Sequence, residues 1–184
     1  MDLKSLLLEK RSHIIRKWRD VVLSTYPEQS QKFFRKQKDA IANPVGSAIN
    51  EGIGSIYDEL LKDSESDEVE LFLDNIIRVR AIQDFSPSKA VSFIFGLKDV
   101  VRDTLGNELR QGKISEELVA FECKIDGLAL RCFDIYTRCR EKIAEIRVNA
   151  VRNQSSRLLQ MAGLAYELPE TEADLEEDKV NSNG

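Results

Sequence analysis

A cluster of polar side chains in the stretch RVRAIQDFSPSKAVSFIFGLK, residues 78–98, is the first candidate for chemistry. Arginine and lysine are the side chains that proteins use to hold anions, and an aromatic residue can supply the apolar wall of a binding pocket. One alternative is therefore a pocket for an anionic small molecule between two helices. Its predicted lining consists of Arg80, Gln83, Asp84, Phe93 and Lys98.

The other alternative for this stretch is an ordinary junction between two helices. Arg80 and Asp84 are four residues apart, so on a helix they face each other and can form an ion pair. Ser86 can cap the next helix, with Pro87 at its first position, and Phe85 can fill the corner. The residues alone leave both alternatives open.

Other reactive residue types are few and badly placed for catalysis. His13 has no acid, cysteine or second histidine at ligand spacing, and we find no nucleotide-binding glycine motif, metalloprotease motif or EF-hand. Cys132 and Cys139 are about 10.5 Å apart along a helix, too far for one disulfide or one zinc ion. We therefore expect no catalytic residue, no metal and no cofactor, and we interpret these cysteines as small apolar side chains.

The composition is that of a globular protein with one domain. The chain has 184 residues, of which 42% are hydrophobic and 32% charged. No apolar run is long enough to span a bilayer, and the start MDLKSLLLEKRSHIIRKW lacks the apolar core of a signal peptide. We therefore expect a cytoplasmic protein that does not insert into a membrane.

The net charge of −5 is concentrated at the C-terminal end. Residues 167–184 hold seven acids and one lysine, whereas the rest of the chain holds 25 acids and 26 bases. A nearly neutral body does not favour nucleic-acid binding. We expect residues 164–184 to be a disordered acidic tail.

The rest of the sequence predicts helices. Apolar residues recur at alternating spacings of three and four, which is typical of helices with one buried face. We predict a single globular all-α bundle of about six helices, with a long C-terminal helix, in a domain covering residues 1–163. The expected helices cover about residues 3–26, 31–39, 43–61, 67–83, 86–112 and 115–160.

Local signals support two of these helices. Asn43 can cap the helix that Pro44 begins. The same helix contains Gly46, Gly52 and Gly54, which lower helix propensity, so we expect a neighbouring helix to approach it closely. In the next helix, Asp74 and Arg78 are spaced to form an ion pair.

The last helix is predicted to have two roles. In its middle, Leu130, Phe133 and Tyr136 lie beside the main apolar stripe, which predicts burial on both sides. The helix is too long for a small domain, and a far end with a sparse apolar stripe usually packs on a partner. We predict a homodimer or other partner contact here, formed by Ile143, Ile146, Ala150 and Leu158.

Four segments, in this order, resemble a known family: IIRKWRDVVLSTYP (14–27), FFRKQKDAIANPVG (33–46), IIRVRAIQDFSPSKAVSFIFGLK (76–98) and FDIYTRCREKIAEIRVN (133–149). The family is the RsbRD N-terminal domain of RsbR-type regulators of the bacterial stress response. The resemblance implies a helical, sensor-like domain that is similar to a globin without haem and acts as a dimer. The position of His13 in the first helix does not match that of a globin's proximal ligand.

In such regulators the domain usually precedes a STAS domain, and in others of this type it precedes a kinase domain. We expect a stand-alone module here, so a phosphorylation switch is not carried over. The predicted function is a non-enzymatic sensory, regulatory or adaptor module of bacterial signal transduction. Its expected partners are a second copy, a full-length regulator or another signalling or metabolic protein. The alternative is a small-molecule-binding protein, or an accessory protein of a redox or metabolic complex.

Overall fold

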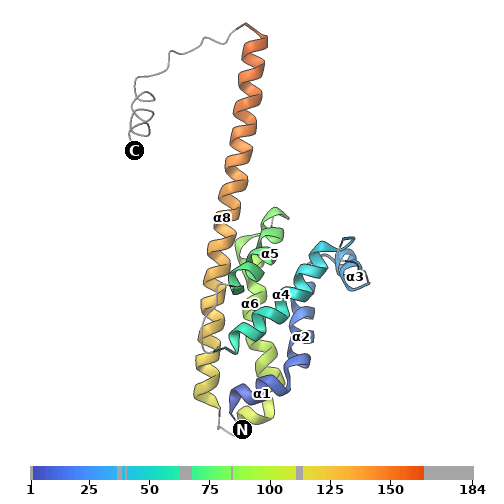
Figure 1. Ribbon diagram of the computed structural model, residues 1–184, viewed down its shortest axis with the longest axis vertical. Coiled ribbons are helices and arrows are strands. Elements are labelled where there is room, and N and C mark those ends of the chain that lie inside the picture. The colour runs from blue at the N-terminus through green and yellow to red at the C-terminus, as the bar shows by residue number, and fades with distance from the viewer. Residues whose placement is uncertain are drawn as a thin grey trace, which may run out of the picture. The chain divides into compact units, whose positions relative to one another are not determined.

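The prediction of an all-α protein with a long C-terminal helix is confirmed. The computed structural model describes residues 2–36, 39, 41–62, 68–83, 85–110 and 114–163, and these residues contain no strand. The helices in chain order are α1 (Leu3–Glu9), α2 (Arg11–Ser24), α3 (Glu28–Lys36), α4 (Pro44–Leu60), α5 (Glu68–Ile82), α6 (Pro87–Thr104), α7 (Gly106–Arg110) and α8 (Ser115–Met161) (Figure 1). The chain forms two compact units, Met1–Ile143 and Ala144–Gly184.

The single helix predicted for residues 3–26 is in fact two helices that meet at Lys10. The backbone of Lys10 leaves helical geometry, with ψ at 6°. Its ammonium group forms an ion pair with Glu108 at 2.6 Å and donates to the carbonyl of Thr104 at 3.4 Å. The break occurs where distant residues bind Lys10, and apolar residues on both sides of it, such as Leu7 and Ile14, are buried.

The predicted helix starts at Asn43 and Ser86 are correct in position, but they differ in chemistry. The Asn43 side chain accepts a hydrogen bond from the Gly46 amide at 2.9 Å, with Pro44 at the first helical position. Ser86 also stands at the cap position, before Pro87, but its hydroxyl makes no capping hydrogen bond. α6 therefore begins without the side-chain cap that the sequence predicts.

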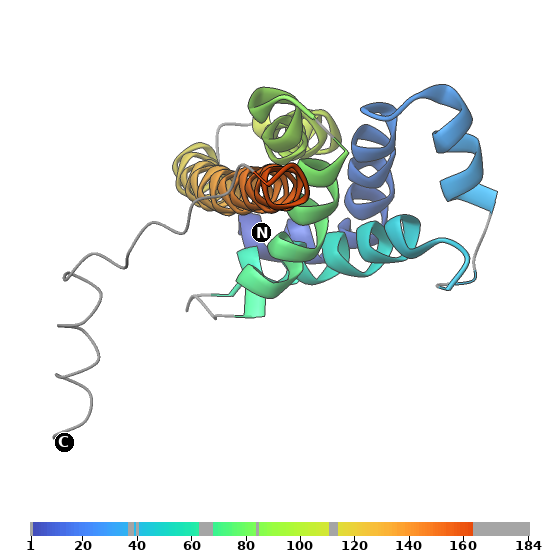
Figure 2. The same ribbon diagram turned by 90° about the horizontal axis from the view of Figure 1, so that it is seen from above.

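Helix α2 packs against α4 and α6, and α4 packs against α5 (Figure 2). Trp18 is buried in this core, and its indole Nε1 donates to the carbonyl of Phe93 at 2.7 Å. The Tyr57 hydroxyl likewise donates to the carbonyl of Leu7 at 3.0 Å. Each large buried side chain contributes roughly 1.5–3 kcal/mol through the hydrophobic effect. Both polar tips are satisfied, so the core buries them without a penalty.

Close approach of helices explains only one of the three glycines singled out in α4. A Cβ atom at Gly52 would lie 2.9 Å from Cδ1 of Ile76 on α5, which confirms the predicted close contact there. At Gly46 a Cβ atom would instead collide with the Asn43 cap, and at Gly54 it would meet nothing nearer than Arg11, at 3.7 Å.

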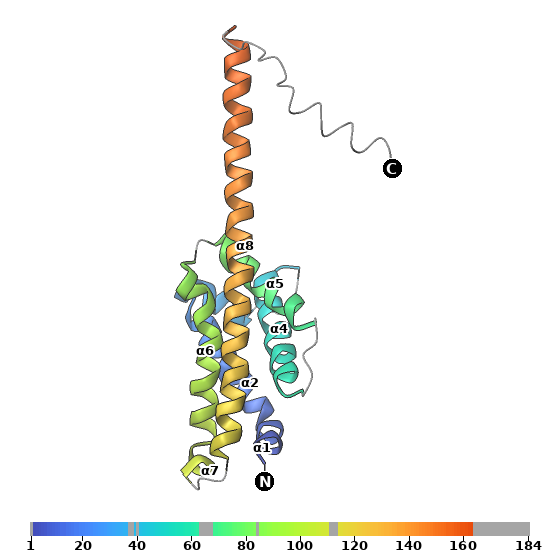
Figure 3. The same cartoon turned by 90° about the vertical axis from the view of Figure 1, so that its left-hand side faces the viewer.

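Up to Ile143, α8 lies alongside α5 and α6 (Figure 3). Ion pairs join it to α6, between Lys98 and Asp126 at 2.6 Å and between Arg102 and Glu122 at 2.6 Å. The buried residues of this part of α8 include Leu118, Phe121, Ile125, Leu128, Cys132 and Ile135. The predicted second buried side is correct only for Tyr136, because Leu130 and Phe133 are exposed.

From Ala144 onward, every described side chain of α8 is exposed. The predicted acidic tail, residues 164–184, lies outside the described residues, and a domain boundary at residue 163 stays a prediction. A globin-like arrangement also stays a prediction. Within the part of the chain that the structure describes, no helix has the length and apolar character needed to cross a bilayer.

Candidate functional site

Two arginines of α5, two residues apart, occupy different environments. Arg80 is completely buried, whereas 62% of the Arg78 side chain is exposed. Residues two apart on an α-helix point to nearly opposite sides because the helix has 3.6 residues per turn. The polar cluster predicted from the sequence therefore divides into an internal cluster around Arg80 and a surface groove around Arg78.

The Arg80 guanidinium group binds the ends of two other helices. Its Nη1 donates to the carbonyls of Lys89 and Ala90, at 3.1 and 3.3 Å, in the first turn of α6. Its Nη2 donates to the Thr25 hydroxyl at 2.9 Å and to the carbonyl of Val22 at 3.4 Å, at the C-terminal end of α2. Arg80 thus joins α5 to α2 and α6.

Three aromatic rings surround the same guanidinium group. The Arg80 Cζ atom lies 4.5 Å from the ring centre of Phe93 and 5.2 Å from those of Tyr26 and Phe85. Cation–π contacts of this kind are worth up to about 2 kcal/mol each when they are desolvated. The rings fill the space around the charge.

The charge of Arg80 is balanced without an ion pair to any acid among the described residues. Burial lowers its pKa, and the carbonyls at the C-terminal end of α2 carry the partial negative charge of that helix terminus. Burial also raises the pKa of the nearby Tyr26. Among the described residues, neither the buried Arg80 Nε nor the buried Tyr26 hydroxyl has a partner within hydrogen-bonding geometry. This cluster has the features of the helix junction that the sequence offered as one alternative.

Four of the five residues predicted to line a pocket are described, and among these four the structure brings together only Arg80 and Phe93. Phe93 contacts Arg80 as described, but Gln83 is exposed to solvent. Lys98 pairs with Asp126 on α8 instead. Asp84 lies outside the described residues, so its predicted ion pair with Arg80 is not described either.

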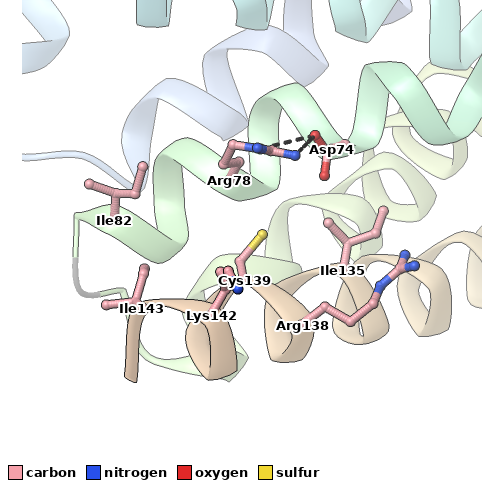
Figure 4. A pocket seen from close by; sticks show the side chains of 8 residues that line it. All are labelled: Asp74, Arg78, Ile82, Ile135, Arg138, Cys139, Lys142 and Ile143. Carbon is pink, nitrogen blue, oxygen red and sulfur yellow. Dashed lines mark hydrogen bonds and ion pairs between the residues drawn. The ribbon is translucent and has the colours of Figure 1, made fainter. Parts of the chain in front are cut away.

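An open groove lies on the Arg78 side of α5, between α5 and α8 (Figure 4). It has a volume of about 390 Å³, which is within the usual range for small-molecule sites. Figure 4 shows side chains from the two helices facing each other across it. The groove is lined by Asp74, Arg78 and Ile82 of α5 and by Ile135, Arg138, Cys139, Lys142 and Ile143 of α8.

The charged side chains of the groove take part in ion pairs. Arg78 donates through Nε and Nη2 to one carboxylate oxygen of Asp74, at 3.1 and 2.7 Å, which confirms the predicted pair. Arg138 donates through Nη2 to Glu70 at 2.9 Å. Both arginines are more than half exposed, so these pairs are worth roughly 0–1 kcal/mol.

The three cysteines lie in three different environments. Cys123 is exposed, Cys132 is buried and Cys139 is partly buried in the groove. Burial raises the pKa of the Cys132 thiol to about 12, against the opposing effect of Arg80. Burial, followed by the Asp74 carboxylate, also raises the pKa of Cys139, while Arg78 and Arg138 lower it. Cys139 is therefore a neutral thiol near pH 7.

Sequence reasoning missed this groove, although two of its signals were visible. The Asp74–Arg78 spacing and the position of Cys139 on the apolar stripe both pointed to residues that line it. The groove also requires α5 to pack against α8, and no local sequence pattern predicts that contact.

The residues predicted for a partner contact are all on α8. Ile143 is partly buried and lines the groove, whereas Ile146, Ala150 and Leu158 are exposed. His13 is an exposed residue of α2 whose Nδ1 lies 3.3 Å from Arg16 Nη2. Among the described residues, no group of three or more His, Cys, Asp or Glu side chains could hold a metal ion.

Comparison with known proteins gives a family. The model of the RsbT co-antagonist protein rsbRD N-terminal domain matches residues 12–151. An uncharacterized protein of Archaeoglobus fulgidus is 27% identical over 141 residues, which cover 75% of this chain and 82% of that protein. No solved structure matches. Because the family model matches well over half of the sequence, this chain belongs to the family of rsbRD N-terminal domains.

Proposed function

We propose that this protein is a non-enzymatic regulatory module of the stress-response signalling system, and that it acts through protein contacts. The match to the rsbRD N-terminal domain over residues 12–151 carries this proposal, because that family consists of regulatory domains. A full-length regulator, or another signalling or metabolic protein, is a natural partner class. A cytoplasmic location stays a prediction.

We also propose that the protein is a homodimer that pairs through the part of α8 beyond Ile143. The exposed residues there include a stripe at alternating spacings of four and three, which is the spacing of a coiled-coil seam. All members of the stripe are small or apolar: Ala144, Val148, Val151, Ser155 and Leu158. A second copy with the same seam would cover it.

The helical period separates the sequence-predicted contact residues into two groups. Leu158 belongs to the stripe, whereas Ile146 is two residues from Val148 and therefore lies on the opposite side of the helix. Ala150 shares the Ile146 side, which continues into the polar residues Asn153 and Arg157. We place the dimer contact on the Leu158 side because its apolar pattern persists for longer.

Light scattering of the full chain tests this proposal. We expect a mass of twice 21.0 kDa, which falls to 21.0 kDa when Val151→Asp and Leu158→Asp are combined. Asn149→Asp with Gln160→Asp is the matched control, since it adds the same charge elsewhere on the same segment. A dimer that survives the first pair but dissociates with Ile146→Asp would move the contact to the other side of α8. A monomeric native chain would contradict self-association altogether.

The alternative function, binding of a small molecule, is supported at a different place from the one predicted. The surroundings of Arg80 are occupied by protein atoms, whereas the groove around Arg78 is open. A role as accessory protein of a redox or metabolic complex stays a prediction.

A further inference from the structure

The groove between α5 and α8 has the chemistry of a ligand site that the dimer proposal does not use. We propose that it binds a small organic anion with an aliphatic body. This inference deepens the small-molecule alternative above and is independent of self-association. Three observations carry it: an apolar floor, free cationic donors and a neutral thiol within the floor.

The floor of the groove is aliphatic. Ile135, Cys139 and Ile143 follow one another at intervals of four along α8, so they form a strip about 12 Å long. Across the groove, Ile82 of α5 is 63% exposed. No aromatic side chain is among the described lining residues, so the floor suits a hydrocarbon chain better than a planar ring. A bound chain would remove exposed apolar surface from water.

The charged lining favours an anion. Three of the described lining residues are basic and one, Asp74, is acidic. Within the described residues, Nη1 of Arg78 and both Nε and Nη1 of Arg138 donate no hydrogen bond. Because the existing ion pairs are exposed and weak, a ligand carboxylate can use these donors without breaking a strong interaction.

The thiol of Cys139 completes the floor as a neutral, weakly polar group. Its raised pKa keeps it protonated near pH 7, so a bound anion does not face a thiolate. The same residue gives the site a chemical reporter, because a ligand on the floor covers its sulfur. A ligand would also contact α5 and α8 together, and would thereby hold these two helices in one arrangement.

The test measures how fast N-ethylmaleimide modifies each cysteine of the full chain, by mass spectrometry, with and without octanoate below its micelle concentration. Cys139 reports on the groove, exposed Cys123 reports on nonspecific effects, and buried Cys132 reports on unfolding. We expect octanoate to slow modification of Cys139 by about tenfold or more at saturation, and to leave Cys123 unchanged. Acetate, which lacks the chain, and octylammonium, which has the opposite charge, should not protect.

Substitutions identify which charges matter. Arg78→Gln combined with Arg138→Gln should weaken protection by octanoate by about tenfold or more, whereas Lys17→Gln, an exposed cation of α2, should have no effect. Asp74→Asn should strengthen protection, because it removes the acid that competes for Arg78. A purely structural role of the Asp74–Arg78 pair would instead weaken it.

Three results would overturn the proposal: no protection of Cys139, equal protection by octanol and octanoate, or equal slowing at Cys123. The first would show that the groove does not bind the chain, the second that the cations play no part, and the third that the effect is not local. None of these outcomes affects the mass measured by light scattering, so failure of this site and failure of the dimer are distinguishable.

Discussion

Arg78 and Arg80 are two residues apart on α5, yet Arg78 is exposed to solvent and Arg80 is buried. Arg80 donates four hydrogen bonds to other helices and is enclosed by three rings. In the part of the chain that the structure describes, Arg78 makes one ion pair, within its own helix, and its Nη1 donates no hydrogen bond. The comparison teaches that the number of hydrogen bonds and ring contacts around an arginine does not identify a binding site. The arginine with many partners stabilises the fold, and the arginine with few partners remains able to bind a ligand.

Removing Arg80 should produce the largest effect. Arg80→Ala removes four hydrogen bonds that tie α5 to α2, Thr25 and α6, and it creates a cavity among three rings. We expect the free energy of unfolding to fall by about 3–5 kcal/mol, measured by urea denaturation. Arg80→Lys keeps the charge but cannot reach the same partners, so its free energy of unfolding should lie between those of the native protein and Arg80→Ala. A loss below about 1 kcal/mol for Arg80→Ala would contradict the importance of the internal cluster.

The second largest effect should be a loss of folding stability at high pH, caused by the buried thiol of Cys132. The native state keeps the Cys132 proton up to about pH 12, whereas a thiol in the unfolded chain loses it near pH 8.5. Above about pH 9 the native state therefore binds more protons, and stability falls by up to about 1.4 kcal/mol per pH unit. Urea denaturation of the native chain and of Cys132→Ala isolates this effect, because both contain the buried tyrosines. Parallel pH profiles for the two proteins would contradict it.

A smaller part of the internal cluster should have a smaller effect. Thr25→Val removes the hydroxyl that accepts from Arg80 at 2.9 Å and donates to the Val22 carbonyl at 2.6 Å, and it leaves Nη2 with only the more distant Val22 carbonyl. We expect a loss of about 1–2 kcal/mol in thermal or urea unfolding. Thr137→Val is the matched control, because its hydroxyl donates to the Phe133 carbonyl at an exposed position and should change stability little. Equal effects of the two substitutions would count against a special role for Thr25.

Arg78 should give the smallest change in stability. Its ion pair with Asp74 is exposed and joins neighbouring turns of one helix, so Arg78→Ala should cost at most about 0.5 kcal/mol. A double-mutant cycle with Asp74→Ala measures the coupling directly. A coupling above about 1 kcal/mol would show that Arg78 also stabilises the fold, and would remove the contrast with Arg80.

Signals that act within one helix were readable from the sequence. The Asn43 cap, the Asp74–Arg78 pair and the start and length of α8 depend on residues a few positions apart, and they are confirmed. The break at Lys10 was not readable, because its ammonium group binds Glu108, which is 98 residues away.

The candidate site depends on contacts between residues that are far apart in the sequence. The partners of Arg80 are mainly backbone carbonyls, which every residue has, so no side-chain pattern could reveal them. Lys98 lies on the same stretch as Arg80 but is held by Asp126 on another helix. The groove exists only because α5 and α8 pack together, and this pairing is set by the whole core.

The first helices of the chain depend on residues made much later. The amide of Leu3 donates to a Glu117 carboxylate oxygen, 114 residues further on, and Trp18 donates to the carbonyl of Phe93, 75 residues further on. At roughly 5–20 residues per second, a ribosome needs about 6–23 s to add the chain between Leu3 and its partner. During that time the apolar faces of α1 and α2 lack their final neighbours. α1 and α2 therefore acquire these contacts only after the residues up to Glu117 have been made, and until then the nascent N-terminal half exposes apolar surface.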